Sequence, residues 1–455
     1  MNLVPKRLLG GVAAIALVAS ACSSTAATPV PTVPPVATPV VTPAPGDTAT
    51  PAPVVTPAAP VTVNWWHITT GEPGKSIFQG IADTYMAAHP NVTIKITVLE
   101  NEAFKTKLAT NMQSGDVPDL FQSWGGGTMA AQADAGMLKD ITTDISGWAN
   151  TINPGALGIY AYKGKQYGVP WDMGMIGVWY NKALFAKVGI TAPPATWDDF
   201  LADVTKLKAG GIVPLAIAGK DMWPSMHLWT YLVLRIGGYQ NLQDMINNKN
   251  WNNPACTAAG DQVVKLNALN PYQAGFRNAT YDNEAAAVGN AKAAMEVMGQ
   301  WAPGVENNDS TSKKGIGADL GWFPFPTVAN GTGDPNDGVG GGNGIAVGKN
   351  ASPEALDFLK FFNSVYNAQK IENPDTTGNN MGLSPVVGVD TTVLSTTLQM
   401  VLAGRDKAPH IQLYLDQATS PAMGTAINKA TVALFDGASD PAKVCQAITD
   451  AAKAG

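Results

Sequence analysis

The composition of the chain changes near residue 60, and this change decides which part of it can fold. Residues 23–60 are Ser, Thr, Ala, Val and Pro almost throughout, and they contain no aromatic residue. Such a segment buries too little apolar surface to offset the entropy lost on ordering. Its frequent prolines favour an extended spacer, and a glycosylated stalk would have the same composition. Any compact fold must therefore be built from the following residues, about 395 in number, which begin at Val61.

Residues 1–21 have the organisation of a secretory signal peptide. Lys6 and Arg7 precede a short apolar run, and small residues precede Cys22. The stretch 17–22 resembles the lipobox of a bacterial lipoprotein, although Ala19 stands where that pattern usually has leucine. We therefore expect cleavage before Cys22, lipidation of its thiol, a linker over residues 22–60, and a protein outside the cell membrane that is anchored to its outer face by lipid. The alternative is an ordinary secretory signal that ends near a cysteine.

The folded part is weakly charged and long. Apolar residues make up 45% of the chain and charged residues 14%, and the net charge of −6 becomes −8 when the two cations of the signal peptide are removed. A mildly acidic surface argues against nucleic acid and anionic lipid as partners. No apolar stretch after residue 22 is long enough to span a bilayer, so we expect membrane attachment through the lipid alone. A single core rarely supports this length, which predicts two lobes.

The cysteines and histidines predict neither a metal site nor a cofactor. Cys256 and Cys445 remain after Cys22 is assigned to lipid, and they are either a disulfide or two buried thiols. The four histidines are scattered, and the chain has no HExxH motif and no cysteine pair at zinc spacing.

Strands and helices alternate in the first part of the fold. The patterns predict strands over 61–68, 92–99 and 119–124, and helices over 74–89 and 102–114. This order indicates a parallel sheet with right-handed crossovers, in which ligands bind beyond the carboxyl ends of the strands. A second unit follows, with a strand over 175–180 and a helix that starts at Thr196. The acidic pair 198–199 is interpreted as the first turn of that helix rather than as catalytic carboxylates.

Several strings in this order resemble family 1 extracellular solute-binding proteins, the sugar-binding components of ATP-driven importers. They lie at 61–67, 117–121, 167–172, 178–185, 194–200, 293–301 and 340–347. The resemblance implies an α/β, two-lobed periplasmic-binding-protein-like fold of type II, similar to cluster D. Each lobe would be a mixed, largely parallel sheet flanked by helices, with the ligand in the cleft between them. One lobe would hold residues 61–173 with 326–370, and the other 174–325 with 371–455.

The same resemblance implies a function. A monomeric protein would close on a sugar by hinge motion and deliver it to the permease subunits of an ABC importer. The strings 298–304 and 323–326 look closest to binders of xylo-oligosaccharides such as xylobiose. Cellobiose, maltose-type sugars and N-acetylglucosamine sugars remain open.

Sugar chemistry selects the candidate ligand-binding residues. Flat aromatic rings cover the C–H face of a sugar, and planar polar groups bind its hydroxyls in a mostly apolar pocket. Two tryptophan–polar pairs are the leading candidates, and the glycine-rich turn over 340–344 is expected to bring Asn343 to the sugar instead of forming a phosphate loop. The complete set is Trp66, His67, Glu72, Trp124, Trp171, Asp172, Trp223, Gln300, Trp301 and Asn343.

Two other classes of protein would require features that this sequence does not display. A secreted glycoside hydrolase would need two carboxyl groups across the scissile bond, and Asp172 and Glu72 are the available nominees. Nothing near either residue singles out an acid, and the chain has no GxSxG motif. An adhesin on a stalk would not need the alternation of strands and helices. The sequence therefore predicts a binding protein and not an enzyme.

Overall fold

The computed structural model describes residues 59–372, 382–392 and 394–454. These described residues belong to one compact unit. The predicted signal peptide, Cys22 and the linker up to residue 58 lie outside the described residues. Among the residues that are described, no helix is both long enough and apolar enough to cross a bilayer.

The first lobe is built on a five-stranded sheet with the strand order β2-β1-β3-β13-β6. Strand β1 pairs in parallel with both β2 and β3, as the alternation of strands and helices predicted. Strand β13 runs antiparallel to its neighbours β3 and β6. The strands are β1 (Val61–His67), β2 (Val92–Val98), β3 (Leu120–Ser123), β6 (Gly168–Pro170) and β13 (Gly344–Val347).

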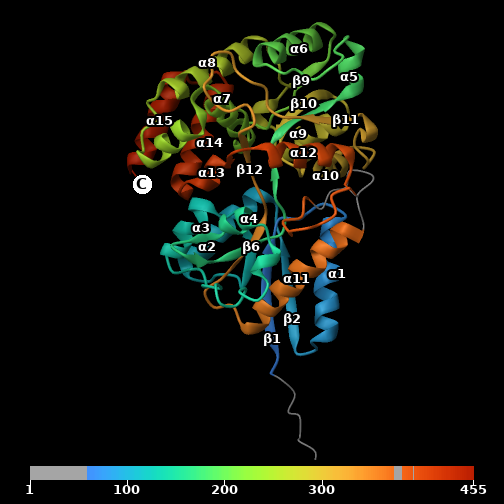
Figure 1. Cartoon of the computed structure of the whole chain (residues 1–455), viewed down its shortest axis with the longest axis vertical. Helices are drawn as coiled ribbons and strands as arrows, with labels where there is room; N and C mark the ends of the chain where they lie inside the picture. The colour runs from blue at the N-terminus through green and yellow to red at the C-terminus, as the bar shows by residue number, and fades with distance from the viewer. Residues whose placement is uncertain (1–58, 373–381, 393, 455) are drawn as a thin grey trace, which may run out of the picture. The chain divides into compact units, whose positions relative to one another are not determined.

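Helices cover this sheet and complete its core. They are α1 (Gly74–Ala88), α2 (Asn101–Ser114), α3 (Gly126–Asp134), α4 (Pro154–Gly158) and α11 (Pro353–Glu372). Helices α1 and α11 pack side by side, as Figure 1 shows. Trp65 is fully buried between them, with ring centroids 5.2 Å from Phe78 and 4.9 Å from Phe362. Helix α11 therefore belongs to this lobe although it lies far along the chain.

The second lobe contains two sheets, with the orders β11-β8-β10-β9 and β14-β12-β7. Each has one parallel and at least one antiparallel pairing, so the expectation of a largely parallel sheet does not hold here. Strand β8 runs antiparallel to both β10 and β11, and β7 runs antiparallel to β12. The sheet of the first lobe likewise has two parallel and two antiparallel pairings. The strands are β7 (Gly174–Met175), β8 (Gly177–Asn181), β9 (Val213–Leu215), β10 (Ala293–Met298), β11 (Leu320–Phe323), β12 (Gly338–Gly341) and β14 (Ile411–Leu413).

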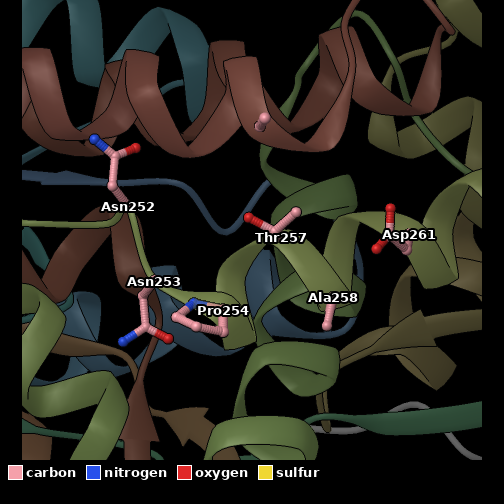
Figure 2. Close-up of a pocket in the computed structure, with 7 residues that line it drawn as sticks. Asn252, Asn253, Pro254, Thr257, Ala258 and Asp261 are labelled. Carbon is pink, nitrogen blue, oxygen red and sulfur yellow. The ribbon is translucent and has the colours of Figure 1, made fainter.

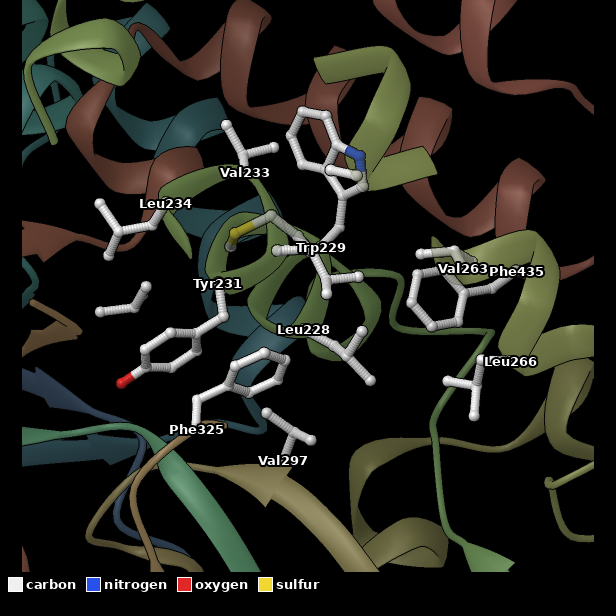
Figure 3. Close-up of a cluster of buried hydrophobic side chains, with 14 of the residues drawn as sticks. Leu228, Trp229, Tyr231, Val233, Leu234, Val263, Leu266, Val297, Phe325 and Phe435 are labelled. Atoms are coloured by element: carbon white, nitrogen blue, oxygen red, sulfur yellow. The ribbon is translucent and has the colours of Figure 1, made fainter. Parts of the chain in front are cut away.

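The helices of the second lobe enclose the larger core. They are α5 (Lys182–Lys187), α6 (Trp197–Ala209), α7 (Trp223–Asn247), α8 (Pro254–Ala268), α9 (Tyr281–Gly289), α10 (Ala302–Asp309), α12 (Thr396–Lys407), α13 (Leu415–Ala418), α14 (Pro421–Phe435) and α15 (Pro441–Ala454). Thr196 caps α6 by accepting from the main-chain N–H of Asp199, which confirms the predicted helix start. Figure 3 shows Tyr231 and Phe325 stacked in this core, with ring centroids 4.7 Å apart.

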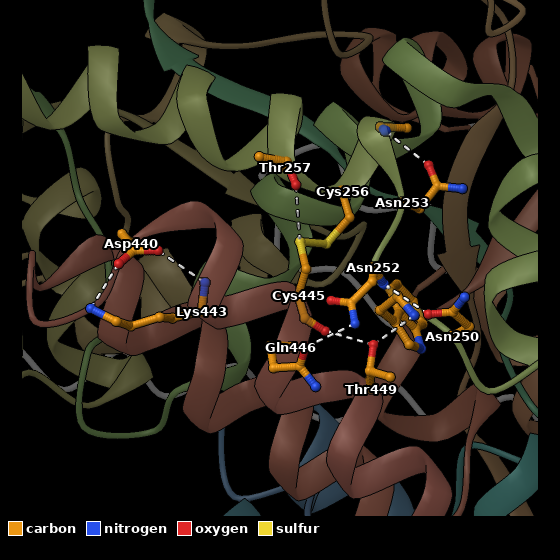
Figure 4. The surroundings of a disulfide bond; sticks show 12 residues. Asn250, Asn252, Asn253, Cys256, Thr257, Asp440, Lys443, Cys445, Gln446 and Thr449 are labelled. Carbon is orange, nitrogen blue, oxygen red and sulfur yellow. Dashed lines mark hydrogen bonds and ion pairs between the residues drawn. A yellow bond between two sulfur atoms is a disulfide. The ribbon is translucent and has the colours of Figure 1, made fainter.

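Cys256 and Cys445 form a disulfide, one of the two alternatives that the sequence left open. It joins α8 to α15, and both residues are almost fully buried (Figure 4). A hydrogen bond beside it also holds α15, since the main-chain N–H of Trp251, just before α8, donates to Thr449 Oγ1 at 2.8 Å. The C-terminal helix is thus fixed to the second lobe.

Two short crossovers carry the chain directly from a strand of one lobe to a strand of the other. Strand β6 of the first lobe ends at Pro170 and β7 begins at Gly174, close to the predicted boundary at residue 173. Strand β12 of the second lobe ends at Gly341 and β13 of the first begins at Gly344. Residues 338–341 therefore pair within the second lobe, whereas the sequence placed the return to the first lobe at residue 326. Crossovers of this kind carry little pattern of their own, so a sequence positions them poorly.

Candidate ligand-binding site

The two crossovers are bonded to each other by a buried polar network. The main-chain N–H groups of Trp171 and Asp172 donate to the carbonyl oxygen of Asn343, at 2.9 and 3.2 Å. In return, the main-chain N–H and the side-chain amide of Asn343 both donate to the Asp172 carboxylate, the latter at 2.9 Å. Three of the predicted site residues, Trp171, Asp172 and Asn343, thus meet at the two crossovers.

Two glutamines extend this network into the lobes. Gln122, on β3 of the first lobe, donates from Nε2 to Asn343 Oδ1 at 2.7 Å. Gln300, which follows β10 of the second lobe, donates from Nε2 to Asp172 Oδ2 at 3.4 Å. Gln122, Asp172 and Gln300 are each at most 2% exposed. Asp172 therefore bonds to amide groups of the protein, a role different from the predicted one of accepting from sugar hydroxyls.

An aromatic group of the second lobe lies next to this network. It consists of Trp223, His227, Tyr281, Trp301 and Tyr414. The Trp301 ring lies 5.9 Å from Tyr414 and 6.4 Å from both Trp223 and His227, measured between centroids. Tyr281 lies 5.0 Å from Trp223. The structure thus brings the predicted residues Trp223 and Trp301 together, and it adds three rings that the sequence analysis did not select.

His227 is an uncharged member of this aromatic group. Burial and the nearby positive charge of Lys105 from the first lobe together lower its pKa to about 3, with burial the larger cause. Its Nδ1 is buried and has no hydrogen-bond partner among the described residues. A neutral imidazole among aromatic rings offers one donor and one acceptor without a charge.

The first lobe contributes Trp124 to the same region. This partly buried ring packs against the core clusters of both lobes. Phe104 lies edge-on to it at 6.1 Å, and Lys105 Nζ lies 5.6 Å from its centroid. The glycines after Trp124 begin α3, and a Cβ on Gly126 would lie 2.6 Å from the carbonyl oxygen of Gln417. Close backbone approach of the two lobes therefore requires glycine here.

Three other predicted residues lie in the core of the first lobe. Trp171 is about nine-tenths buried, with Phe78 and Tyr366 edge-on to it at 5.6 and 5.4 Å. Trp66 packs among the residues between β1 and α2, with Lys107 Nζ 4.5 Å from its ring. His67 is 2% exposed, and burial lowers its pKa to about 4. The structure does not bring these three side chains into the aromatic group.

Glu72 contributes its main chain to the junction between the lobes. Its side chain accepts from the N–H of Ser76 in the first turn of α1. Its main-chain N–H donates to Asn308 Oδ1 at 3.2 Å, and its carbonyl oxygen accepts from Asn308 Nδ2 at 2.7 Å. Because Asn308 lies on α10, this amide bridges the two lobes. The second carboxylate nominated for catalysis is therefore occupied with capping a helix.

Carboxylates from both lobes face one another near this bridge. Burial and the charges of Asp282 and Asp221 raise the pKa of Glu100, which comes from the first lobe. Burial and the charge of Asp221 raise the pKa of Asp282. The pKa of Asp309 rises to about 6 because of burial and of the neighbouring charges of Asp282 and Glu100. The positive charge of Lys313 opposes the rise for Asp309, so three carboxylates and one lysine lie together on this side of the junction.

Two hollows on the described surface contain no aromatic lining residue. One borders α8 and is lined by Asn252, Asn253, Pro254, Thr257, Ala258, Asp261 and Ala442 (Figure 2). The other is lined by residues near 382–394 and by Leu402, Arg405 and Asp406. Neither offers a flat ring for a sugar face. Among the described residues, no cluster of His, Cys, Asp and Glu has the arrangement of a metal site.

The site residues that were not predicted differ in how strongly the local sequence marks them. His227 lies four residues after Trp223 on α7, so helical spacing places both on one face. Tyr281 directly follows the helix cap Thr280, and a capping box signals that helix start. Gln122 and Tyr414 lie on short strands or connections whose partners are distant in sequence, and no local pattern marks them.

Comparison with known proteins identifies relatives of the whole fold. A family model described as bacterial extracellular solute-binding protein matches residues 69–367. The chain is 29% identical over 252 residues to an uncharacterized ABC transporter extracellular-binding protein of Pyrococcus horikoshii, covering 53% of this chain and 55% of that protein. It is 26% identical over 308 residues to a multiple sugar-binding protein of Streptococcus mutans, covering 63% and 68%. The chain thus spans about half to two thirds of the length of these relatives.

A solved structure agrees over a larger span. It comes from work on xylan utilization by the thermophilic bacterium Caldanaerobius polysaccharolyticus, and it is 26% identical in sequence to this chain. The TM-score is 0.79, and the match covers 86% of this chain and 99% of that one. The two-lobed α/β fold is therefore that of known binding proteins.

Proposed function

Because this chain belongs to the bacterial extracellular solute-binding protein family, whose members act outside the cytoplasm, we propose that it binds a sugar and delivers it to an ABC-type importer. The observation that carries the proposal is that Trp124 of the first lobe and Trp301 of the second lie on either side of Lys105 and His227. Lys105 Nζ lies 5.6 Å from the Trp124 ring and its charge acts on His227, whose ring lies 6.4 Å from Trp301. Rings on both sides of a sugar cover its C–H faces. Hinge closure of the lobes is the expected mode of capture.

The proposed ligand is a neutral oligosaccharide. Carboxylates of both lobes lie at the junction, and they would repel an anionic sugar. The multiple sugar-binding relative and the solved structure from work on xylan utilization support sugars of this class. We propose xylo-oligosaccharides as the first sugars to test. We also propose that the protein is a monomer, that lipid on Cys22 anchors it, and that it docks on permease subunits.

The first experiment is a thermal-shift screen of the full chain against mono- and oligosaccharides. A sugar that binds only the native state stabilises it by about 2.7 kcal/mol at a hundredfold excess over Kd. Chromatography of the same samples shows whether the sugar is recovered intact. An intact stabilising sugar supports a transport receptor, and a cleaved sugar would support the alternative of a glycoside-active enzyme. No shift with any sugar would contradict the proposal.

A substitution tests the site itself. We expect Trp301→Ala to weaken binding of the stabilising sugar by about 1.4 kcal/mol or more, a factor of about ten, measured by titration calorimetry. Trp148→Ala is the matched control, because this partly buried tryptophan packs on the core of the first lobe alone. Equal affinities of a folded Trp301→Ala variant and the parent protein would remove Trp301 from the site.

A further inference from the structure

Four amide and carboxylate side chains form a continuous relay from one lobe to the other. In order they are Gln122, Asn343, Asp172 and Gln300, joined by hydrogen bonds of 2.7, 2.9 and 3.4 Å between side-chain atoms. The first residue lies on a strand of the first lobe and the last follows a strand of the second. The two middle residues lie in the crossovers. The relay therefore passes through two of the connections between the lobes, those at residues 171–173 and 342–343.

Glycines next to Asp172 and Gln300 leave the space that these two relay side chains occupy. A Cβ on Gly342 would lie 2.1 Å from the carbonyl oxygen of Asp172, and one on Gly174 would lie 2.1 Å from Gln300 Oε1. A Cβ on Gly382 would lie 2.7 Å from Asp172 Oδ2. Three glycines from separate segments thus leave room for one carboxylate and one amide. Such a buried carboxylate is stable only when donors surround it, as here.

Each end of the relay lies beside a proposed sugar platform. Trp124 comes two residues after Gln122, and Trp301 directly follows Gln300. Tyr414 also lies close to the relay. Burial raises the pKa of its hydroxyl, and the negative charge of Asp172 is near enough to raise it further. The relay is therefore placed to set the separation of the two tryptophans.

We propose that Asp172 is a positioning residue that holds the crossovers in the sugar-binding arrangement, and that it acts through Asn343, Gln122 and Gln300 rather than by contact with the sugar. This inference rests on the proposed function. It assigns Asp172 a place in the relay and leaves sugar contacts to the aromatic group. The bond from Gln300 to Asp172 is the longest of the three side-chain bonds, which makes it the point at which the relay parts when the lobes open.

The test is a double-substitution cycle on the full chain carrying Cys22→Ser. Asp172→Asn removes the charge at the centre of the relay, and Gln122→Met removes the donor at one end without touching Asp172. Each should weaken binding of xylobiose and of maltose by about tenfold, and by similar factors for the two sugars. In combination they should weaken binding less than the product of the single factors, because both interrupt one relay. Asp261→Asn, an exposed change on α8, is the control.

A rescue variant separates positioning from sugar contact. Asp172→Asn combined with Asn343→Asp exchanges the two side chains and keeps the bond between them, so it should recover most of the lost affinity. A direct sugar contact would predict no recovery, and additive single effects would also overturn the proposal.

A measurement without sugar keeps this test independent of the proposed function. Spin labels on Gln79→Cys in α1 and Lys187→Cys in α5 report the distance between the lobes. We expect Asp172→Asn and Gln122→Met to shift or broaden this distance distribution in the sugar-free protein, whereas Asp261→Asn leaves it unchanged. Unaltered distributions in folded relay variants would refute the relay. Failure of both sugars to bind, with altered distributions, would refute the sugar assignment alone.

Discussion

Three buried carboxyl groups lie beneath the aromatic group, and removing one of them is expected to change how stability depends on pH. Glu284 of α9, Glu296 of β10 and Glu306 of α10 are each at most 1% exposed. Glu296 lies within hydrogen-bonding reach of both others. Within the described part of the chain, no lysine, arginine or histidine forms an ion pair with any of the three. The perturbation is Glu296→Gln, which keeps the shape and removes the ionisable group.

The magnitude follows from the pKa of Glu296. Burial raises it to about 7, while hydrogen bonds from Glu306 and Glu284 favour its anion and limit the rise. Because the pKa is about 4.3 in an unfolded chain, the protonated group stabilises the fold fully below that pH. This stabilisation is lost as the pH rises through about 7. Between pH 5 and pH 8 the loss from Glu296 amounts to about 2–3 kcal/mol.

The assay is urea unfolding at pH 5 and at pH 8, followed by tryptophan fluorescence. The free energy of unfolding of Glu296→Gln should fall less between these pH values than that of the parent protein, by about 2–3 kcal/mol. His67 and His227 have lowered pKa values, so burying them in the neutral form stabilises the fold at high pH. That contribution decreases as the pH falls below about 6.5, opposite to the effect of Glu296. They are present in both proteins and cancel in the comparison. Asp261→Asn should follow the parent, and parallel pH profiles for Glu296→Gln and the parent would refute the reasoning.

Two further predictions concern the disulfide and the bridge between the lobes. Replacing Cys256 and Cys445 together by Ala should lower the urea midpoint, because the disulfide closes a loop across 189 residues. The chain-entropy model gives an upper value of about 5 kcal/mol for the lost free energy of unfolding. An unchanged midpoint would contradict this prediction. Asn308→Ala removes the only side chain that bonds to the main chain of Glu72 in the described structure. It should weaken sugar binding several-fold, measured by calorimetry. Asn336→Ala, an exposed change, is the control and should leave the affinity unaltered. Equal affinity of Asn308→Ala and the parent would show that this bridge does not support closure.

The first lobe was predicted well because its elements have strong local patterns. Strand β1 was expected over 61–68 and is observed over Val61–His67, and α1 ends at Ala88 just before Pro90. Alternation and helical spacing depend only on near neighbours, so a sequence displays them directly. Strands β12 and β13 carry mostly glycine and small residues, and their sheet partners come from distant segments. Nothing local indicates where one lobe ends and the other begins at this point.

The candidate site was predicted in part for the same physical reason. Adjacent tryptophan and polar residues suggested sugar contacts at Trp171 with Asp172 and at Gln300 with Trp301. Neither pair lies within a strand or a helix, however, so no periodic pattern shows which member faces the interior. Trp171 faces the core of the first lobe, while Asp172 and Gln300 bond to each other across the crossover. Only the fold decides which member of a pair faces which way.

Three hydrogen bonds to two residues, Trp179 and Asp172, hold the segment that carries Trp301. The indole N–H of Trp179 donates to the carbonyl oxygens of Met298 and Gly299, both at 3.0 Å, and Gln300 bonds to Asp172. A Cβ on Gly299 would lie 2.1 Å from the Trp301 ring, so only glycine lets the ring fold back over its own strand. A ring fixed in this way loses little freedom when a sugar stacks on it, and less of the contact energy is then offset by ordering. The bonds that position Trp301 therefore contribute to affinity although none of them touches the sugar, which is why the relay variants are expected to weaken binding of different sugars alike.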